Sequence, residues 1–463
     1  MSLKNPYLSS LRTYQKEATQ KWVDNNRIGF FEMATGSGKT VTALNCALDL
    51  FKENREVRLL ILVPTLTLAN QWEGIVNKFG FEHIIQTNGK NKNWDKDIIH
   101  LCNLGFNRKI TYCIISTYAT FLTKRFQSAI DYFPKSTFLV ADEAHNFGTE
   151  RIIKKYPKQF TYRLGLSATP YRYFDEAGTR NMLNYFGSTN GVTFQYDMQT
   201  AIQDGYLCEY YYNPKTVELT DSEMEQYYAI SKKLWKFFDS DTGGYIDSPS
   251  VSILLQKRKQ VIQKAHNKTK CLREILHQLL LDRPKLNYTL IYVPEGKSNT
   301  FDDEDQRLIN EYSKVVRQEF GLNQHQFIGE TDNRKDVLER FEKGEIEVLT
   351  AMKCLDEGID IARTEIAIFC ASSNNSRQFI QRRGRILRKH PEKQFAYIYD
   401  MIVIPKIKLD KHSENWAMER NMLNSELRRV REFAELAVNK YQSLETLDKI
   451  AKEYELNIYS NND

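Results

Sequence analysis

Short apolar runs alternate with segments of helical spacing over most of the chain. Leu66 to Phe79, for example, carries apolar residues at Leu68, Trp72, Ile75 and Phe79, as one face of a helix does. Strands are predicted at residues 57–65, 111–116, 137–141, 163–166, 287–293, 346–351, 366–370 and 395–399. Strands that alternate with helices predict parallel, doubly wound sheets, whose ligands bind at the carboxyl ends of the strands.

A change of pattern between Leu219 and Leu281 divides the chain, because this stretch is helical and charged. We therefore predict an α/β fold with two parallel-sheet lobes in tandem. The expected parts are a first lobe at 1–212, a helical linking region at 213–285, a second lobe at 286–408 and a helical tail at 409–463. In the tail, one helix from Asn421 to Tyr441 is expected to pack on the second lobe through Leu423, Leu427, Val430, Ala434, Ala437 and Tyr441.

Composition is that of a globular protein that stays in the compartment where it is made. The 463 residues suit two or three domains, and apolar and charged contents are 41% and 27%. No apolar run is long enough for a membrane span, and no signal peptide is evident, so we expect a cytoplasmic protein. Seven cysteines without a Cys-x-x-Cys pair argue against disulfides and zinc. The net charge of +6 permits a polyanionic partner without requiring one.

The sequence Ala-Thr-Gly-Ser-Gly-Lys-Thr at residues 34–40 follows a predicted strand and precedes a predicted helix. The backbone of Thr35, Gly36, Ser37 and Gly38 would curl around a phosphate, with the helix N-terminus behind it. Lys39 would reach the β- and γ-phosphates of a nucleoside triphosphate, and Thr40 would ligate Mg²⁺. Met33 occupies a position at which the general pattern has glycine. The alternative is a plain glycine turn with a surface lysine.

An acidic pair, Asp142 and Glu143, comes directly after an apolar strand. Near a phosphate loop, one carboxylate can hold Mg²⁺ and the other can orient and deprotonate the attacking water, and we assign Asp142 and Glu143 to these roles. A solvated acidic strand end is the alternative. Ahead of the loop, the amide of Gln15 suits the edge of adenine, although an exposed helical glutamine is common.

Two further segments carry chemistry. Ser167 and Thr169 end a short apolar run, and their hydroxyls can relay hydrogen bonds between the nucleotide and a second site, unless they form a simple turn. Arg382, Arg385 and Arg388 recur every third residue, which on a helix places them along one side. Such a row is either solvated or faces phosphate, and the second lobe would then donate it to the triphosphate held by the first.

A stretch of basic residues interleaved with apolar ones lies between the two lobes. It contains Lys257, Arg258, Lys259, Lys264, Lys268 and Lys270. The solvated face of an amphipathic helix is the favoured interpretation, and a contact with a phosphate backbone is the alternative.

The order of these segments resembles that of superfamily-two helicases and translocases. The resemblance covers residues 12–15 (Q motif), 34–40 (motif I), 63–72 (motif Ia), 116–118 (motif Ib), 142–145 (Asp-Glu-Ala-His, motif II), 167–169 (motif III), 356–360 (motif V) and 381–388 (motif VI). Leu-Arg-x-Tyr-Gln, Asp-Glu-Ala-His and Gln-Arg-x-Gly-Arg-Ile-Leu-Arg together are most similar to the XPB, UvsW and RadD group, which acts mostly on duplex or branched DNA.

The resemblance implies two RecA-like lobes with ATP and Mg²⁺ between them and nucleic acid across both. Adenine would contact Gln15 and Arg12, and the γ-phosphate would face Arg385 and Arg388. Gly358 and Asp360 would couple lobe closure to hydrolysis. Nucleic-acid contacts are implied for Pro64, Thr65, Gln71, Thr117 and Tyr118, and coupling between sites for His145, Ser167, Thr169 and Gln381.

The expected function is an ATP-dependent helicase or translocase on duplex or branched DNA, associated with the nucleoid and with DNA repair. No strand-separating Arg-Glu-Asp element is evident, so both unwinding and translocation stay open. The same motifs also fit the ATPase motor of a restriction or anti-phage assembly with protein partners, an RNA helicase, and a non-catalytic switch that binds ATP and a partner protein.

Overall fold

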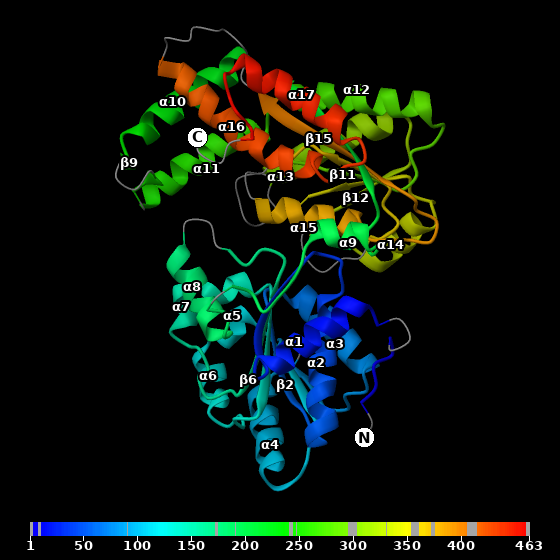
Figure 1. Cartoon of the computed structure of the whole chain (residues 1–463). Helices are drawn as coiled ribbons and strands as arrows, with labels where there is room; N and C mark the ends of the chain where they lie inside the picture. Colours follow the sequence, from blue (N-terminus) through cyan, green and yellow to red (C-terminus); the bar gives the residue numbers. More distant parts are fainter. Residues whose placement is uncertain are drawn as a thin grey trace. The chain divides into compact units, whose positions relative to one another are not determined.

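A computed structural model describes residues 3–7, 11–89, 91–171, 175–189, 191–239, 244–246, 248–294, 303–329, 331–352, 361–371, 376–404 and 414–459. The chain divides into two compact units, Met1–Leu207 and Cys208–Asp463. Each unit is built around its own parallel sheet. The predicted fold class, two parallel-sheet α/β lobes in tandem, is confirmed (Figure 1).

The first unit contains a seven-stranded sheet in which every pair of neighbouring strands is parallel. In spatial order the strands are β3 (Ile84–Gln86), β4 (Tyr112–Thr117), β2 (Arg58–Val63), β5 (Thr137–Asp142), β6 (Tyr162–Ser167), β1 (Ile28–Met33) and β7 (Phe194–Tyr196). All six residues of β2, β4 and β5 are buried. This is why these strands read as continuous apolar runs, since helices cover both faces of a parallel sheet.

Helices lie on both sides of this sheet, as Figure 1 shows for α2 and α3 on one side and α6 and α8 on the other. They are α1 (Thr13–Asp24), α2 (Lys39–Asn54), α3 (Leu66–Lys78), α4 (Trp94–Asn107), α5 (Tyr118–Phe121), α6 (Lys124–Ile130), α7 (Glu150–Ile153), α8 (Glu176–Tyr185) and α9 (Met198–Gln203), with a 3₁₀ turn at Ala144–Gly148. Threonine hydroxyls cap several of them: Thr65 accepts from the Leu68 amide and Thr117 from the Thr120 amide.

The second unit contains a six-stranded parallel sheet and a short antiparallel pair. In spatial order the sheet contains β12 (Gln324–Phe327), β13 (Val348–Ala351), β11 (Thr289–Tyr292), β14 (Ile366–Phe369), β15 (Ala396–Ile404) and β8 (Tyr210–Glu218), and the pair is β9 (Phe238–Asp239) with β10 (Gly244–Tyr245). Strand β8 lies at the predicted junction of the first lobe and the linking region. It contains Pro214, which an edge strand tolerates because one side of its backbone needs no ladder partner.

The free edge of β8 is covered by the segment that begins the last helix. The Val438 amide donates to the Tyr210 carbonyl at 2.9 Å. Asn439 exchanges two hydrogen bonds with the backbone of Tyr212, and Ser443 Oγ donates to the same carbonyl at 2.6 Å. Backbone groups that would otherwise invite another strand are therefore satisfied within the chain.

Helices of the second unit are α10 (Asp221–Trp235), α11 (Pro249–Gln263), α12 (Asn267–Asp282), α13 (Asp303–Lys314), α14 (Arg334–Glu342), α15 (Ser376–Ile386), α16 (Glu414–Ala434) and α17 (Lys440–Glu453), with a π-helical turn at Val315–Glu319. The single tail helix predicted from Asn421 to Tyr441 is wrong, because the chain turns between α16 and α17. Leu423, Leu427 and Val430 are buried as predicted, but Tyr441 is 84% exposed.

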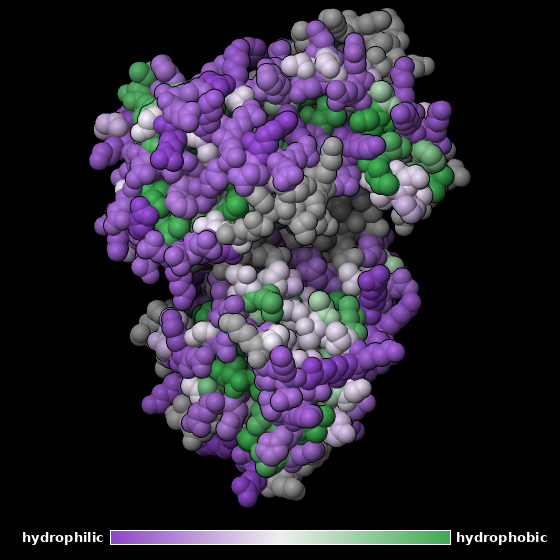
Figure 2. Space-filling model, turned by 180° about the vertical axis from the view of Figure 1, so that it is seen from behind, coloured by the Kyte–Doolittle hydropathy of each residue, from purple (hydrophilic) through white to green (hydrophobic). Residues whose placement is uncertain are grey.

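Polar residues cover most of the face seen in Figure 2, with apolar patches between them. Among the described residues, no helix is both long and apolar enough to cross a bilayer.

A buried acid on α16 makes the stability of the second unit depend on pH. The Glu419 carboxylate accepts a hydrogen bond from the Tyr228 hydroxyl of α10, and burial raises the pKa of Glu419 to about 7. Because the folded state holds this proton more tightly than the unfolded chain, stability is lost as pH rises from about 4.5 to about 7. We expect Glu419→Gln to raise Tm relative to wild type by about 2 °C more at pH 8 than at pH 5, in calorimetry. Exposed Glu445→Gln is the control, and an equal difference at both pH values would contradict the assignment.

Candidate ATP and nucleic-acid site

The phosphate-loop sequence forms a turn between β1 and α2. Gly36 and Gly38 have φ angles of 86° and 90°, in the left-handed region that favours glycine. A Cβ atom at Gly38 would lie 2.9 Å from Gln15 Nε2, so a side chain here would displace the Gln15 amide. The loop curls around the N-terminus of α2, a helix of 16 residues, and this geometry binds phosphate.

The absence of glycine at position 33 has a structural explanation. Met33 is the last residue of β1, where it pairs with Tyr196 of β7, and its side chain is fully buried. Its carbonyl oxygen accepts a hydrogen bond of 3.2 Å from Lys39 Nζ. Position 33 contributes its backbone to the loop and its side chain to the core, so the freedom of glycine is needed only at later positions.

Thr35 and Ser37 of the loop and Thr40 at the start of α2 carry hydroxyl groups. Ser37 is fully buried and donates to the Ala34 carbonyl at 2.7 Å. Thr35 is also buried, and its Oγ1 has no hydrogen-bond partner among the described residues. Thr40 is half-buried at the start of α2. A buried hydroxyl without a partner is unusual, and a ligand oxygen at this position would satisfy Thr35.

Arg12 and Gln15 lie beside the loop. Gln15 Nε2 donates to the Gly38 carbonyl at 3.4 Å, and Gln15 Oε1 accepts from the Arg12 amide at 3.1 Å. Arg12 Nη1 donates to the Ser37 carbonyl at 3.3 Å. Tyr14, to which the sequence assigned no role, also donates from its hydroxyl to the Ser37 carbonyl. The predicted adenine-binding residues are therefore tied to the loop that would hold the phosphates of the same nucleotide.

Asp142 ends β5, which β6 separates from β1. Its carboxylate is 5% exposed and accepts from the Glu143 amide at 2.9 Å. Burial and the adjacent Glu143 carboxylate raise the pKa of Asp142, although the positive charge of Lys39 acts in the opposite direction. The buried Asp142 carboxylate and the half-buried Glu143 carboxylate beside it, with one lysine, leave negative charge that a divalent cation would balance.

A chain of polar contacts leads from Glu143 to the end of β6. Glu143 has φ of 46°, a strained conformation for a non-glycine residue, and its Oε2 lies 3.5 Å from His145 Nδ1. The same ring nitrogen lies 3.3 Å from Ser167 Oγ, which accepts from the Thr169 amide at 3.1 Å. The structure thus brings together the three first-unit residues predicted to couple the sites.

Two aromatic side chains donate hydrogen bonds to Asp142. Trp72 of α3 donates from Nε1 to Asp142 Oδ2 at 2.8 Å, and the Tyr118 hydroxyl donates to the Asp142 carbonyl at 2.7 Å. Tyr118 is buried against Phe147, with ring centroids 6.2 Å apart, so its ring is turned away from the surface where a nucleic-acid contact was predicted. The sequence places Trp72 on an apolar helix face, and nothing in that spacing indicates its partner.

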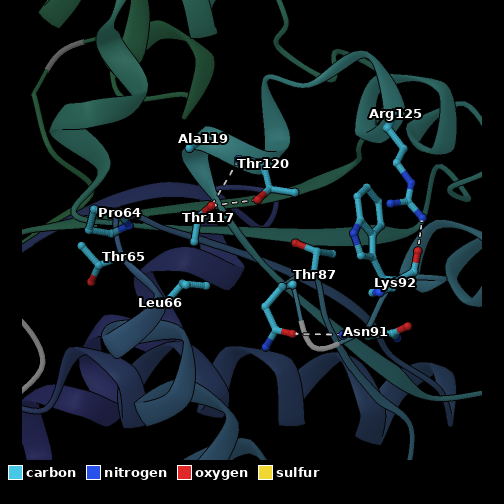
Figure 3. Close-up of a pocket in the computed structure, with 13 residues that line it drawn as sticks. Pro64, Thr65, Leu66, Thr87, Asn91, Lys92, Thr117, Ala119, Thr120 and Arg125 are labelled. Carbon is cyan, nitrogen blue, oxygen red and sulfur yellow. Dashed lines mark hydrogen bonds between the residues drawn. The ribbon is translucent and has the colours of Figure 1, made fainter.

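A cavity of about 790 Å³ lies over the carboxyl ends of β2, β4 and β3 (Figure 3). Three of the residues for which nucleic-acid contacts were predicted, Pro64, Thr65 and Thr117, line this cavity. Sequence reasoning missed the other lining residues, which are Leu66, Thr87, Asn88, Gly89, Asn91, Lys92, Trp94, Ala119, Thr120 and Arg125. Among the described lining residues, Lys92 and Arg125 carry charge, and both are positive, which suits a polyanion.

Arg125 is held in position at the rim of this cavity. Its guanidinium donates to the Lys92 carbonyl and to Asp95, and it lies 4.6 Å from the centre of the Trp94 ring. On the opposite side, Figure 3 shows Thr65 and Leu66 at the start of α3 and Thr117 at the start of α5. We define these cavity-lining residues as the groove.

The arginine segment of the second unit differs from the prediction in one respect. Arg382 and Arg385 lie on α15 and are buried, but the helix ends at Ile386, so Arg388 lies in the following turn and does not share the helix face. Lys393 is also buried and donates to the carbonyl oxygens of Ile386 and Arg388, the latter at 2.9 Å. Arg382 and Arg385 are therefore not solvated, whereas Arg388 is half-buried.

Four predicted residues remain. Gln71 is on α3 but does not line the groove, and Gln381 is on α15. Gly358 and Asp360 lie outside the described residues.

Comparisons with known proteins agree with this architecture. A family model described as "Type III restriction enzyme, res subunit" matches residues 8–172, and one described as "Helicase conserved C-terminal domain" matches residues 267–390. The chain is 28% identical to the DNA 3'-5' translocase XPB2 of Sulfurisphaera tokodaii over 82% of its own length and 79% of that protein. It is 26% identical to a putative DNA 3'-5' helicase Rad25 of Haloarcula marismortui, of which it spans half the length.

Solved structures show the same fold. The helicase domain of Pyrococcus furiosus Hef matches 90% of this chain and 100% of its own, with a TM-score of 0.53 and 17% identity. The Type ISP restriction-modification enzyme LlaBIII bound to DNA matches 98% of this chain and 33% of its own, with a TM-score of 0.61 and 17% identity.

Two RecA-like lobes with a phosphate loop and an acidic strand end, together with the two matched family models and the helicase relatives, identify the chain as a superfamily-two helicase. Within the superfamily, the sequence relatives place it with the XPB and Rad25 group.

The glycine at position 38 provides a test of the loop. We expect Gly38→Ala to weaken ATP binding at least about tenfold, because alanine disfavours φ of 90° and its Cβ would meet Gln15 Nε2. Titration with a fluorescent ATP analogue measures the affinity. The matched control is Gly74→Ala on α3, where a Cβ atom would meet nothing within 4 Å. Equal affinities for the two variants would exclude a nucleotide from this loop.

Proposed function

We propose that the chain is an ATP-dependent DNA translocase or helicase in which one sheet edge carries both the ATP site and a nucleic-acid groove. The observation that carries this proposal is the strand order. The phosphate loop follows β1, Ser167 and Thr169 lie at the end of β6 and the acidic pair lies at the end of β5, while the groove follows β2, β4 and β3. Asp142 ends β5, the strand between β6 of the ATP half and β2 of the groove half, and its carboxylate accepts a hydrogen bond from Trp72 of α3, the helix that begins at the groove.

In the ATP half, the chain's own groups have distinct roles. Lys39 would bind the β- and γ-phosphates, Thr40 and Asp142 would hold Mg²⁺, and Glu143 would orient the attacking water. The ion, when bound, neutralises charge on the phosphates. The backbone of the glycine loop and the N-terminus of α2 supply fixed positive dipoles at the same place. Arg12 and Gln15 would contact adenine, and Arg385 and Arg388 of the second unit would complete the site at the γ-phosphate.

In the groove, phosphates would bind to the N-terminus of α3, the Thr65 and Thr117 hydroxyls, Lys92 and Arg125. Most of these groups recognise the backbone of a nucleic acid and not its bases, so binding would depend strongly on salt and weakly on sequence. His145, Ser167 and Thr169 connect Glu143 to the end of β6, and they would report the state of the nucleotide to the rest of the lobe.

ATPase assays with blunt duplex DNA, forked DNA, single-stranded DNA and RNA, each at two salt concentrations, test the proposal. We expect DNA to stimulate hydrolysis and the stimulation to decline at higher salt. Glu143→Gln should bind ATP normally and hydrolyse it about 10²- to 10³-fold more slowly, because the general base is lost. Stimulation by RNA alone would identify an RNA helicase. If no nucleic acid stimulated hydrolysis, the result would instead favour the switch that binds ATP and a partner protein.

The contacts of Asp142 predict a separate defect. Trp72→Phe keeps an aromatic ring but removes the hydrogen bond to the carboxylate, which is worth about 1.5–3 kcal/mol for a charged acceptor. We expect the Mg²⁺ concentration for half-maximal ATPase to rise about 10- to 100-fold, and Tyr118→Phe to cause a smaller rise. Tyr185→Phe is the matched control, since this buried tyrosine donates to the Pro157 carbonyl away from the site. An unchanged Mg²⁺ dependence in Trp72→Phe would show that Asp142 does not hold the ion.

A restriction or anti-phage motor is a second candidate. It is favoured by the restriction-subunit family model over residues 8–172 and by the structural match to a restriction-modification enzyme. Such a motor would be isolated from its native cell together with a nuclease subunit, whereas a repair translocase would not.

A further inference from the structure

The second unit carries a helical arm whose far end has no part in the proposed ATP site or groove. We define the arm as α10, the β9–β10 pair and α11. At its base, Met224, Tyr227 and Ile262 are buried in the core of the unit. Figure 1 shows the two helices running side by side to the β9–β10 pair, which we define as the tip together with Trp235 and Ile246.

Large apolar side chains are exposed at the tip. Trp235 is 59% exposed, Ile246 54% and Phe238 36%. Figure 2 shows apolar patches among polar atoms over this end of the arm. Single exposed apolar residues are common, but a cluster that includes tryptophan is characteristic of a binding surface.

The rings at the tip are already ordered against one another. The rings of Trp235 and Phe238 stack with centroids 4.9 Å apart and an angle of 3° between their planes, and Tyr245 meets Phe238 edge to face. Arg258 Nη1 donates to the Tyr245 hydroxyl at 3.3 Å. A flat ligand could stack on this platform at a small entropic cost, because the rings are fixed before it binds.

The charge around the rings selects the kind of ligand. Between residues 232 and 259 there are six basic residues and three acidic ones. Lys233, Lys236 and Lys257 have exposed side chains. Protein interfaces are depleted of lysine, whereas nucleic-acid surfaces combine lysine with aromatic rings on which bases stack. Bases inside a duplex are already stacked on their neighbours, so an exposed ring platform fits an unpaired base.

Trp235 and Tyr245 also line a cavity of about 300 Å³ between the arm and α16, with Arg258 and Lys259 in its wall. This volume is at the lower end of those that hold small ligands. We propose that the tip of the arm is a second nucleic-acid contact, at which the Trp235 ring stacks on an unpaired base while neighbouring lysines contact the flanking phosphates. The contact rests on the proposed nucleic-acid function but not on ATP hydrolysis.

The test compares two DNA ligands with the same base-paired length, one blunt and one with unpaired arms, by fluorescence anisotropy of the full chain without nucleotide. We expect Trp235→Ala to weaken binding of the forked DNA about 5- to 100-fold and to change binding of the blunt duplex less than about twofold. Trp235→Phe should restore most of the forked affinity. Lys236→Gln should reduce the slope of log affinity against log salt by about one on the forked ligand.

Tyr441→Ala is the matched control, because Tyr441 is an 84% exposed ring on α17 of the same unit and lies outside the tip. Unchanged forked affinity in Trp235→Ala would overturn the proposed contact. An equal loss on both ligands would also overturn it, because a base contact must distinguish unpaired strands. Failure of the wild type to bind either ligand would instead overturn the proposed nucleic-acid function, so the two failures are distinguishable.

Discussion

The parallel direction of the strands is the constraint on which the candidate site depends. In a parallel sheet all carboxyl ends meet at one edge, so residues far apart in sequence gather there if their strands are neighbours. In the first unit β1, β6 and β5 are consecutive, and this places the phosphate loop, Ser167 and Asp142 side by side. Because β2 is the next strand, the start of α3 adjoins the acidic pair. The order of the strands therefore brings together site residues that no local sequence pattern connects.

Burial of Asp142 gives this arrangement its electrostatic character. A carboxylate with little access to water is costly unless other groups compensate for its charge. Trp72 and the Glu143 amide donate hydrogen bonds to it, and Lys39 contributes positive charge, while the Glu143 carboxylate acts against all three. This balance holds the side chain in one position and still favours a cation beside it. The residues that fix Asp142 come from helices that also begin at the groove, so the two halves of the sheet edge share structural elements.

Sequence reasoning located the residues whose chemistry depends on local order. Asp142 ends an apolar strand, and Lys39 follows another after a short glycine loop, so pattern and motif agree. The strands and helices around them were predicted to within a few residues. The partner of Trp72 could not be predicted, because it lies 70 residues away and is determined by the strand order.

Lys92 and Arg125 of the groove belong to segments without a motif. The fold brings them to the groove through the positions of β3 and α6. Strand β8 was not predicted; it contains Pro214, which is uncommon in strands except at a sheet edge. Arg388 does not lie on the predicted helix face, because α15 ends two residues before it. The spacing of the arginines alone does not reveal this boundary.

The cover over β8 has a practical consequence for how the chain can be shortened. Val438, Asn439 and Ser443 occupy backbone groups of β8 that another strand could otherwise use. A fragment that stopped after α16 would keep every residue of both candidate sites and yet offer an open sheet edge to its neighbours in solution. Self-association of such a fragment would then reflect the missing cap and not any natural oligomer. Trimmed versions intended for crystallisation should therefore retain α17.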